Sequence, residues 1–377
     1  MHEPAKHQRT SELTQAHIGI IGAGQLGQML ALAGIAMGQR FTFLDPSSQA
    51  PAGKLGRHIQ AEYDDELALE QLAVECDVIT LEFENVPISA VTSVGRHNQI
   101  HPGERALSIA QDRVHEKQYF ESLGIPVATY QPVDSLAALE AAVLMIGYPA
   151  ILKTRRLGYD GKGQALIRSA ADLTDAWAQM HNHPAILEKM VPFIREVSLI
   201  AVRGLTGECA FYPVGENQHR SGILQRTEIH PADPAQAEAE VYARRVLSGL
   251  DYVGVLAIEF FEHKGQLIAN EMAPRVHNSG HWTQNGAVTS QFENHLRAIL
   301  GWPLGRTECI GHSMMLNLIG KMPSHRAILA IPGVHLHDYG KEPRAGRKLG
   351  HLNIVGNTQT ECRARATQVE QLIRYGN

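Results

Sequence analysis

Several residue types that mark particular protein classes are scarce in this sequence of 377 residues. There are only four cysteines, Cys76, Cys209, Cys309 and Cys362, and they form no C-x-x-C pair. This argues against a disulfide framework and a cysteine-based metal site. Cysteines so few and so far apart are typical of reduced thiols in a cytoplasmic protein.

An excess of positive charge is also lacking. Lys and Arg number 34 against 39 Asp and Glu, a formal net charge of −5. Nucleic-acid and membrane-surface binders are normally basic over most of a domain, so neither partner is expected. No stretch approaches the roughly 20 apolar residues of a transmembrane helix. The polar residues 1–16 lack the apolar run of a signal peptide, and we expect a disordered tail there.

What the sequence does contain is a regular alternation of short apolar runs and amphipathic segments. Apolar runs at 17–21, 41–44 and 78–83, with helix-like segments between them, predict a parallel α/β domain. From residue 112 onward, short β-rich runs between polar or glycine-rich loops predict an α+β part with mostly antiparallel sheet. The 44% of hydrophobic residues suffices for the cores of two or three domains.

A first glycine motif lies between the first apolar run and the helix that follows. Gly22, Gly24 and Gly27 form a G-x-G-x-x-G turn, and Asp45 ends the next run. Both features fit the fingerprint of dinucleotide binding, in which glycines admit a pyrophosphate and the acid binds a ribose hydroxyl. The same turn binds other phosphates or nothing, so an NAD-dependent oxidoreductase is one alternative among several.

A second glycine-rich loop follows the apolar run PAILKT. Gly158, Gly161 and Gly163 permit backbone N–H groups to close over a polyphosphate, and Lys153 can reach phosphate oxygens. A surface hairpin explains the glycines but not the lysine, so phosphate binding is favoured. Further on, the backbone of residues 188–191 can bind the edge of an adenine, and Glu196 can bind ribose hydroxyls. Taken alone, exposed strand ends are the better explanation of these residues.

Two acids inside apolar strands carry the clearest physical signal. Glu259 lies in VLAIEFF and Glu271 in LIANEMAPR, and a turn at residues 263–265 can set both beside Asn270. Carboxylates in apolar strands are costly unless they are paired or bind a metal. Mg²⁺, which takes one or two carboxylates plus substrate phosphates, suits such a pair. A buried salt bridge to an arginine is the alternative.

Two further segments are rich in cations and histidines. One is RVHNSGHW at residues 275–282. The other, residues 341–351, has four cationic residues and one acid, 4 − 1 = +3, and is interrupted by Pro343, Gly346 and Gly350. A shaped loop that binds phosphate or carboxylate and a plain solvated face explain this run equally well.

In chain order these motifs resemble the N5-carboxyaminoimidazole ribonucleotide synthases, a family of ATP-grasp ligases. The resemblance covers residues 18 to about 355, and NEMAPRVHNSGHWT is its most specific part. One departure is Leu157, where the family often has a glycine. The motifs are GAGQLGQM (22–29), LGYDGKGQ (157–164), EKMVPF (188–193), NEMAPRVHNSGHWTQNGA (270–287) and GRKLGHLN (346–353).

The resemblance implies an α/β and α+β chain with an ATP-grasp fold. It places a Rossmann-like pre-ATP-grasp domain at 17–111 and an ATP-grasp domain at 112–305. A lid subdomain would span about 120–190, and residues 306–377 would form a small β-rich C-terminal domain. A homodimer is expected on the same ground.

The resemblance also assigns site residues. It implies that Glu259 and Glu271 bind Mg²⁺, with Mn²⁺ as a substitute, and that ATP is a co-substrate. The residues placed around ATP are Arg113, Lys153, Gly158, Tyr159, Asp160, Gly161, Lys162, Gly163, Gln164, Glu188, Lys189, Met190, Val191, Glu196, His219, Asn270 and Glu271.

For the reacting groups, the family implies the catalytic residues Tyr159, Asp160, Arg275, His277 and Lys348. The ribonucleotide would contact Gln25, Leu26, Arg275, His277, Lys341, Arg347 and Lys348. The glycine turn at 22–27 then lies on the substrate side, and no nicotinamide is implied.

The implied reaction joins bicarbonate to the exocyclic amine of 5-aminoimidazole ribonucleotide through carboxyphosphate, in purine biosynthesis. Three alternatives remain at this point: a formate-using glycinamide ribonucleotide transformylase of the same superfamily, the NAD-dependent oxidoreductase, and a nucleotide-binding regulator without activity.

Overall fold

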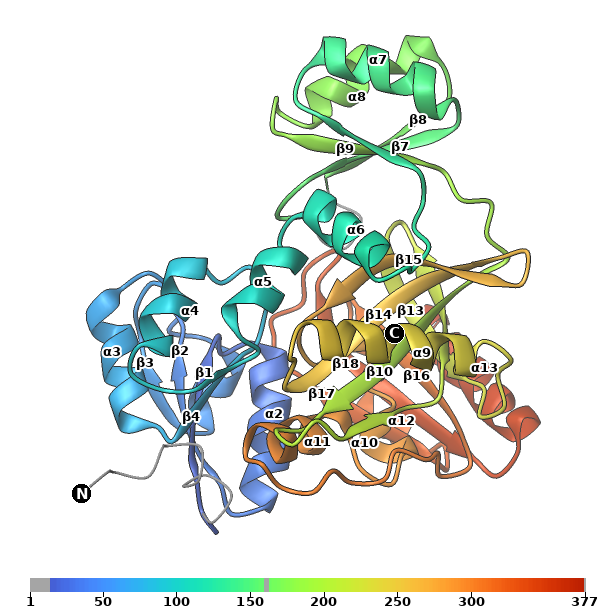
Figure 1. The fold of residues 1–377 in the computed structure, drawn as a ribbon. Helices are drawn as coiled ribbons and strands as arrows, with labels where there is room; N and C mark the ends of the chain where they lie inside the picture. Colours follow the sequence, from blue (N-terminus) through green and yellow to red (C-terminus); the bar gives the residue numbers. More distant parts are fainter. Residues whose placement is uncertain (1–13, 159–162, 376–377) are drawn as a thin grey trace.

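The computed structural model describes residues 14–158 and 163–375 (Figure 1). Most of the predicted tail, and the predicted site residues Tyr159, Asp160, Gly161 and Lys162, therefore lie outside the described residues. The described residues form three sheets, and none of their helices is long and apolar enough to cross a membrane.

The N-terminal unit is a five-stranded parallel sheet in the order β3-β2-β1-β4-β5, as the apolar runs predict (Figure 1, blue). The central strands β1, β2 and β4 are mostly buried because helices cover both faces of the sheet. The strands are β1 (His17–Ile21), β2 (Arg40–Leu44), β3 (Arg57–Ile59), β4 (Val78–Leu81) and β5 (Ile100–His101). The helices are α2 (Gln25–Ala36), η1 (Pro51–Lys54), α3 (Glu66–Glu75), α4 (Ile88–Gly95) and α5 (Glu104–Ala110).

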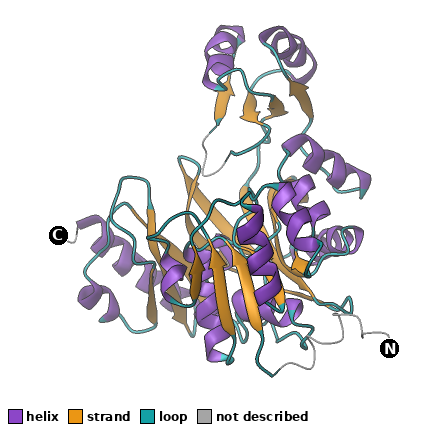
Figure 2. Cartoon of the chain, turned by 90° about the vertical axis from the view of Figure 1, so that its left-hand side faces the viewer, coloured by secondary structure: helices purple, strands orange, loops and turns teal. Residues whose placement is uncertain are grey.

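Residues 130–189, which fall within the predicted lid subdomain, are called the lid unit below. The lid unit stands apart from the rest of the chain, with two helices on one face of a small antiparallel sheet (Figures 1 and 2). It has its own apolar core, which includes Leu139, Leu152 and Trp177. Its strands, in the order β6-β9-β7-β8, are β6 (Tyr130–Val133), β7 (Ala150–Thr154), β8 (Gln164–Ile167) and β9 (Ala185–Lys189). Its helices are α7 (Leu136–Ile146), η2 (Ala170–Asp172) and α8 (Leu173–Gln179).

The central sheet has nine strands in the order β15-β14-β10-β12-β13-β16-β18-β17, with β11 also paired to β10. The strands are β10 (Arg195–Arg203), β11 (Cys209–Phe211), β12 (Gly215–Arg220), β13 (Ile223–Ile229), β14 (Gly254–His263), β15 (Gln266–Ala273), β16 (His312–Ile319), β17 (Val334–Asp338) and β18 (Lys348–Gly356). The helices around it are α6 (Arg113–Ser122), α9 (Gln236–Gly249), η3 (Asn278–Gly280), α10 (Thr283–Gly286), α11 (Gln291–Ile299), α12 (His325–Leu329) and α13 (Gln359–Tyr375).

The C-terminal strands continue this central sheet. They are β-rich as expected, but β16 pairs antiparallel with β13, with Arg226 opposite Leu316. An unpaired edge of β13 would leave backbone N–H and C=O groups without partners, and β16 satisfies them. The segment that carries the +3 charge run therefore joins the same sheet as Glu259 and Glu271.

Candidate active site

Glu259 and Glu271 lie directly opposite each other on β14 and β15, as the sequence predicts. The register shifts next to Glu259, so that Asn270 is the extra residue of a β-bulge. Consecutive strand residues normally point to opposite faces, but a bulge redirects one of them. Asn270 and Glu271 consequently both line the same cavity.

Two carboxylates side by side at this position favour the binding of a cation. Burial, and then Glu271, raise the pKa of Glu259 to about 7. Burial also acts to raise the pKa of Glu271, but the Arg113 guanidinium, 2.8 Å away, outweighs it and holds the pKa at about 2. The alternative of an arginine salt bridge is thus realised for Glu271, while Glu259 has no arginine or lysine within ion-pair distance among the described residues.

These two carboxylates fit a magnesium site only if a substrate supplies the other ligands. No group of three or more His, Cys, Asp or Glu side chains with metal-binding geometry occurs among the described residues. Mg²⁺ needs only one or two carboxylates when phosphate oxygens complete its shell. The donor set therefore suits a metal–nucleotide complex better than a closed protein site.

The lid cavity, of about 340 Å³, lies between the lid unit and the central sheet. It contains several of the predicted nucleotide contacts. Its lining includes Arg113, Lys153, Gly163, Gln164, Glu196, His219, Asn270 and Glu271.

Lys153 belongs to a buried cluster of opposite charges at the base of the lid. Its ammonium group lies 2.9 Å from Oε2 of Glu188, and that of Lys117 lies 3.6 Å from the same oxygen. Lys117 also donates to the carbonyl oxygen of Asn270 at 2.9 Å. Glu188 is buried, so the interpretation of an exposed strand end is wrong for it. After Glu188, Lys189 and Met190 are exposed and Val191 is half-buried.

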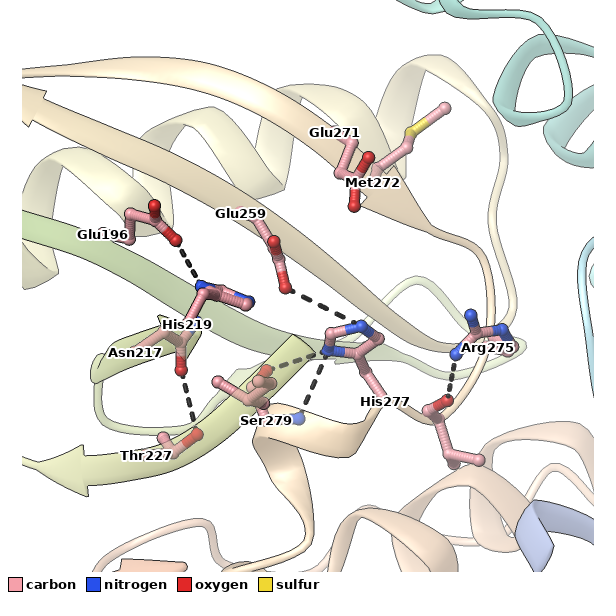
Figure 3. A network of polar contacts seen from close by, with 12 residues as sticks. Glu196, Asn217, His219, Thr227, Glu259, Glu271, Met272, Arg275, His277 and Ser279 are labelled. Carbon is pink, nitrogen blue, oxygen red and sulfur yellow. Dashed lines mark hydrogen bonds and ion pairs between the residues drawn. The ribbon is translucent and has the colours of Figure 1, made fainter. Parts of the chain in front are cut away.

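Glu196 and His219 form an ion pair that faces the lid cavity (Figure 3). Burial acts to lower the pKa of His219, but the hydrogen bond that its ring donates to Glu196 and the charge of Glu259 raise it above its ordinary value. His219 is therefore protonated more readily than a free imidazole, beside three carboxylates.

The backbone at the two ends of the glycine-rich loop, Leu157 and Gly163, adopts conformations that favour glycine. Gly163 has φ +69°, and a Cβ atom there would lie 2.6 Å from Oγ1 of Thr154. Leu157 also adopts a positive φ, 60°, a conformation that glycine reaches without steric cost. The glycine often found at this position in the family is therefore the better match to the backbone.

The N-terminal cavity, of about 300 Å³, is lined by the start of α2 and the end of β4. Gln25 and Leu26, for which contact with the ribonucleotide is predicted, line it together with Arg275, His277 and Lys348. Lys341 is not among the described residues that line either cavity, but its ammonium group donates to Oε1 of Gln25, which lines this one. Arg347 does not line either cavity among the described residues, and it donates to the carbonyl oxygen of Glu342 at 3.1 Å.

The dinucleotide alternative fails on the geometry of the first glycine turn. The N–H groups of Gly24 and Leu26 donate to the carboxylate of Glu82, and that of Ala23 donates to Asp45. The anion site at the start of α2 is thus filled by the chain's own carboxylate. A pyrophosphate would have to displace the Glu82 carboxylate to reach these N–H groups.

Glu82 and Glu84 are site residues that the sequence reasoning missed. Glu84 forms a two-pronged ion pair with Arg275, in which Nη2 lies 3.0 Å from Oε1. Both acids follow β4, and ligands of parallel sheets bind beyond the carboxyl ends of the strands. An acid directly after an apolar strand was the signal that could have found them.

His277 lies where the two cavities meet, with its two ring nitrogens in different surroundings (Figure 3). Nδ1 accepts from the backbone N–H of Ser279 at 3.3 Å, and Nε2 lies 3.7 Å from Glu259. Burial, and then Arg275 and Lys348, lower the pKa of His277 to about 3. The ring is therefore neutral and directs an N–H group from Nε2 toward the cavities.

The two cavities share their central lining and form one chamber. The shared residues are Arg113, Glu259, Glu271, His277, Asn278 and Lys348. The chamber thus joins a nucleotide-sized space beside the acid pair to a second space beside α2. Such an arrangement can bring two substrates to one point.

Comparison with known proteins agrees with this architecture. Three family models match in order: the ribonucleotide synthetase preATP-grasp domain at residues 15–111, the ATP-grasp domain at 118–292, and the phosphoribosylaminoimidazole carboxylase C-terminal domain at 313–365. The predicted fold class is thereby confirmed.

Individual relatives match almost end to end. The N5-carboxyaminoimidazole ribonucleotide synthase of Pseudomonas aeruginosa is 52% identical over 94% of this chain and 99% of its own length. That of Brucella melitensis is 47% identical over 92% and 98%.

Solved structures extend the likeness to three dimensions. The N5-carboxyaminoimidazole ribonucleotide synthetase of Thermus thermophilus superposes with a TM-score of 0.90 at 49% identity, over 94% of this chain and 98% of that one. The synthase of Aspergillus clavatus, solved with ADP and 5-aminoimidazole ribonucleotide, gives 0.89 at 29% identity, over 96% and 99%. The chain therefore belongs to the N5-carboxyaminoimidazole ribonucleotide synthase family of ATP-grasp ligases.

Proposed function

We propose that this chain is the ATP-dependent, ADP-forming ligase that carboxylates 5-aminoimidazole ribonucleotide to N5-carboxyaminoimidazole ribonucleotide, with bicarbonate as the carbon source, in purine biosynthesis. The observation that carries the proposal is the single chamber with an acid pair and a lysine at one end and Gln25 and Lys341 at the other. ATP at the first end and the ribonucleotide at the second would meet at His277 and Lys348.

At the nucleotide end, Lys153, Arg113 and His219 supply positive charge for the triphosphate. Glu259 and Glu271 would hold Mg²⁺, which neutralises phosphate charge when it is bound. The predicted contacts at Glu188, Lys189, Met190 and Val191 remain part of this proposal, as do those of the loop Gly158–Gln164.

The reaction requires two displacement steps. An oxygen of bicarbonate attacks the γ-phosphorus of ATP, the bond to the β–γ bridging oxygen breaks, and ADP leaves. The amine nitrogen of the ribonucleotide then attacks the carbon of carboxyphosphate. The carbon–oxygen bond to phosphate breaks, and the amine loses one proton as the product forms.

The residues at the centre of the chamber suit these steps. Lys348 and Arg275 place cationic groups where negative charge moves from bicarbonate to phosphate, which stabilises the transition states. His277, neutral with its N–H on Nε2, can donate to a carboxyl or phosphoryl oxygen. Asp160 would orient the amine and Tyr159 would face bicarbonate; both roles are implied by the family resemblance.

Because carboxyphosphate reacts with water, the chamber must close during turnover. The lid unit and its glycine-rich loop are the parts suited to do so. We also propose a cytoplasmic homodimer. All four cysteines are unpaired, in line with a reducing compartment.

A coupled assay of ADP release tests the proposal. Release should require both bicarbonate and 5-aminoimidazole ribonucleotide, and the carboxylated product should appear in equal amount. The formate-using transformylase predicts release with formate and glycinamide ribonucleotide instead. ATP binding without any turnover would favour the inactive regulator and contradict the proposed activity.

A further inference from the structure

The loop between β17 and β18 carries Lys341 beside a buried tyrosine that the proposed reaction does not use. Residues 342–346 of this loop are exposed, so the loop itself does little to hold the lysine. The ammonium group of Lys341 donates to Gln25 and lies 5.8 Å from the centre of the Tyr339 ring. That distance is within the range of a cation–π contact.

Tyr339 is itself fixed from behind. It is 2% exposed, and its hydroxyl lies 2.8 Å from Nδ1 of His351. Nε2 of His351 lies 2.9 Å from Oε1 of Gln284, and an amide oxygen only accepts hydrogen bonds. Nε2 therefore carries the ring proton, and Nδ1 accepts from the tyrosine hydroxyl.

His351 in turn packs against two further imidazoles, stacked on His337 and tilted by 38° relative to His281. Its ring lies 4.4 Å from that of His337 at an interplanar angle of 6°, and 4.7 Å from that of His281. Burial, and then the two neighbouring rings, hold the pKa of His351 well below its ordinary value. The pKa values of His281 and His337 are lowered as well, so the three rings are neutral near pH 7.

We propose that Tyr339 is a positioning residue: anchored by His351, its ring holds the ammonium group of Lys341 beside Gln25 at the ribonucleotide end of the chamber. This rests on the proposed function, in which Lys341 and Gln25 contact the ribonucleotide. Tyr339 lines the N-terminal cavity and is not among the described residues that line the lid cavity. Its effect is therefore on the ribonucleotide and not on ATP.

Steady-state kinetics of three variants test this. Tyr339→Leu removes the ring and should raise the KM for 5-aminoimidazole ribonucleotide roughly 3- to 30-fold. Tyr339→Phe keeps the ring but loses its anchor, and should raise that KM roughly 2- to 10-fold. The KM for ATP should change less than about 2-fold, because substitutions distant from a site act nearly independently of it.

Tyr212→Phe is the matched control. Tyr212 is also fully buried, and its hydroxyl donates to the carbonyl oxygen of Thr289, away from both cavities. It should lower the thermal midpoint as Tyr339→Phe does and leave both KM values unchanged. An equal rise in both KM values for the Tyr339 variants, or no rise in either, overturns the proposal.

A second measurement does not depend on turnover. The rate at which acetic anhydride modifies Lys341, followed by mass spectrometry against the exposed Lys54 of the same chain, reports how firmly its amine is held. Tyr339→Leu should accelerate modification of Lys341 and not of Lys54. An unchanged rate overturns the positioning role, whereas a wild-type protein without ribonucleotide-dependent ADP release overturns the proposed function.

Discussion

Glu271 is the residue on which most of the proposed chemistry depends. Its carboxylate meets the Arg113 guanidinium at 2.8 Å and faces Glu259 across the strand pair. Arg113 keeps Glu271 ionised, and the negative charge of Glu271 raises the pKa of Glu259. The pair therefore favours the binding of a further cation.

Glu271→Gln should reduce ADP release by about 10²-fold or more, the scale of losing one charged group from an organised site. The readout is the coupled ADP assay at several magnesium concentrations. Glu308→Gln, which changes an exposed ion pair with Arg306, should leave the rate unchanged. Near-normal turnover by the first variant at unchanged magnesium dependence would exclude Glu271 as a metal ligand.

The contribution of Glu188 to the stability of the protein depends on pH. Burial acts to raise its pKa, but Lys117 and Lys153 hold it at about 2, below the ordinary 4.5. A lowered carboxyl pKa contributes stability that is complete above about pH 4.5 and disappears as the pH falls toward 2.

Glu188→Gln should therefore lower the free energy of unfolding by roughly 3 kcal/mol at pH 7. The difference in the free energy of unfolding between the variant and the wild type should become smaller toward pH 3. Urea unfolding at pH 7, 4 and 3 measures it. A gap that is constant with pH would show that the Glu188 charge makes no difference to stability.

At the scale of single elements, the bulge in β15 and the glycine-rich loop decide what the chamber contains. The bulge brings Asn270 and Glu271 to one cavity, although strand alternation would separate them. No sequence pattern announced that bulge. The loop was predicted from its glycines, and the structure adds that Leu157 at its start has a positive φ of 60°.

Gly163→Ala should cost stability and also weaken ATP binding, because its Cβ would meet the Thr154 hydroxyl. Gly147→Ala is the control: its φ is +75°, and no atom lies within 4 Å of a Cβ there. Both should lose roughly 1–3 kcal/mol of stability through a positive φ, but only Gly163→Ala should raise the KM for ATP. A normal KM for ATP in that variant would show that the base of the loop is not part of the nucleotide site.

At the scale of the whole molecule, the chamber depends on contacts between opposite ends of the chain. Lys341 meets Gln25 across 316 residues of sequence, and Arg275 meets Glu84 across 191. The continuation of the central sheet through β16 and β18 is what brings the C-terminal cations to the N-terminal unit.

A double-mutant cycle on Gln25→Ala and Lys341→Ala tests this long-range contact. The two changes should be less than additive in the KM for 5-aminoimidazole ribonucleotide, with a coupling of about 1 kcal/mol. A cycle on Arg306 and Glu308, an exposed pair on the same chain, should show no coupling in that KM. Strict additivity for the first pair would show that Lys341 and Gln25 do not act together in binding the ribonucleotide.

The sequence by itself determined the classes of element and most of the chemistry. Apolar periodicity predicted the parallel N-terminal sheet, and the cost of a carboxylate in an apolar strand pointed to Glu259 and Glu271. These inferences succeed because burial and local backbone preference act over a few residues. The exact domain boundaries and the individual roles of the site residues stay predictions.

Only the tertiary structure decided which groups share the chamber. It placed Glu82 in the anion site of the glycine turn, paired Glu84 with Arg275, and set Tyr339 beneath Lys341. It also left Arg347 outside both cavities. These contacts depend on strand order and register across hundreds of residues, and long-range register is set by packing that no local pattern records.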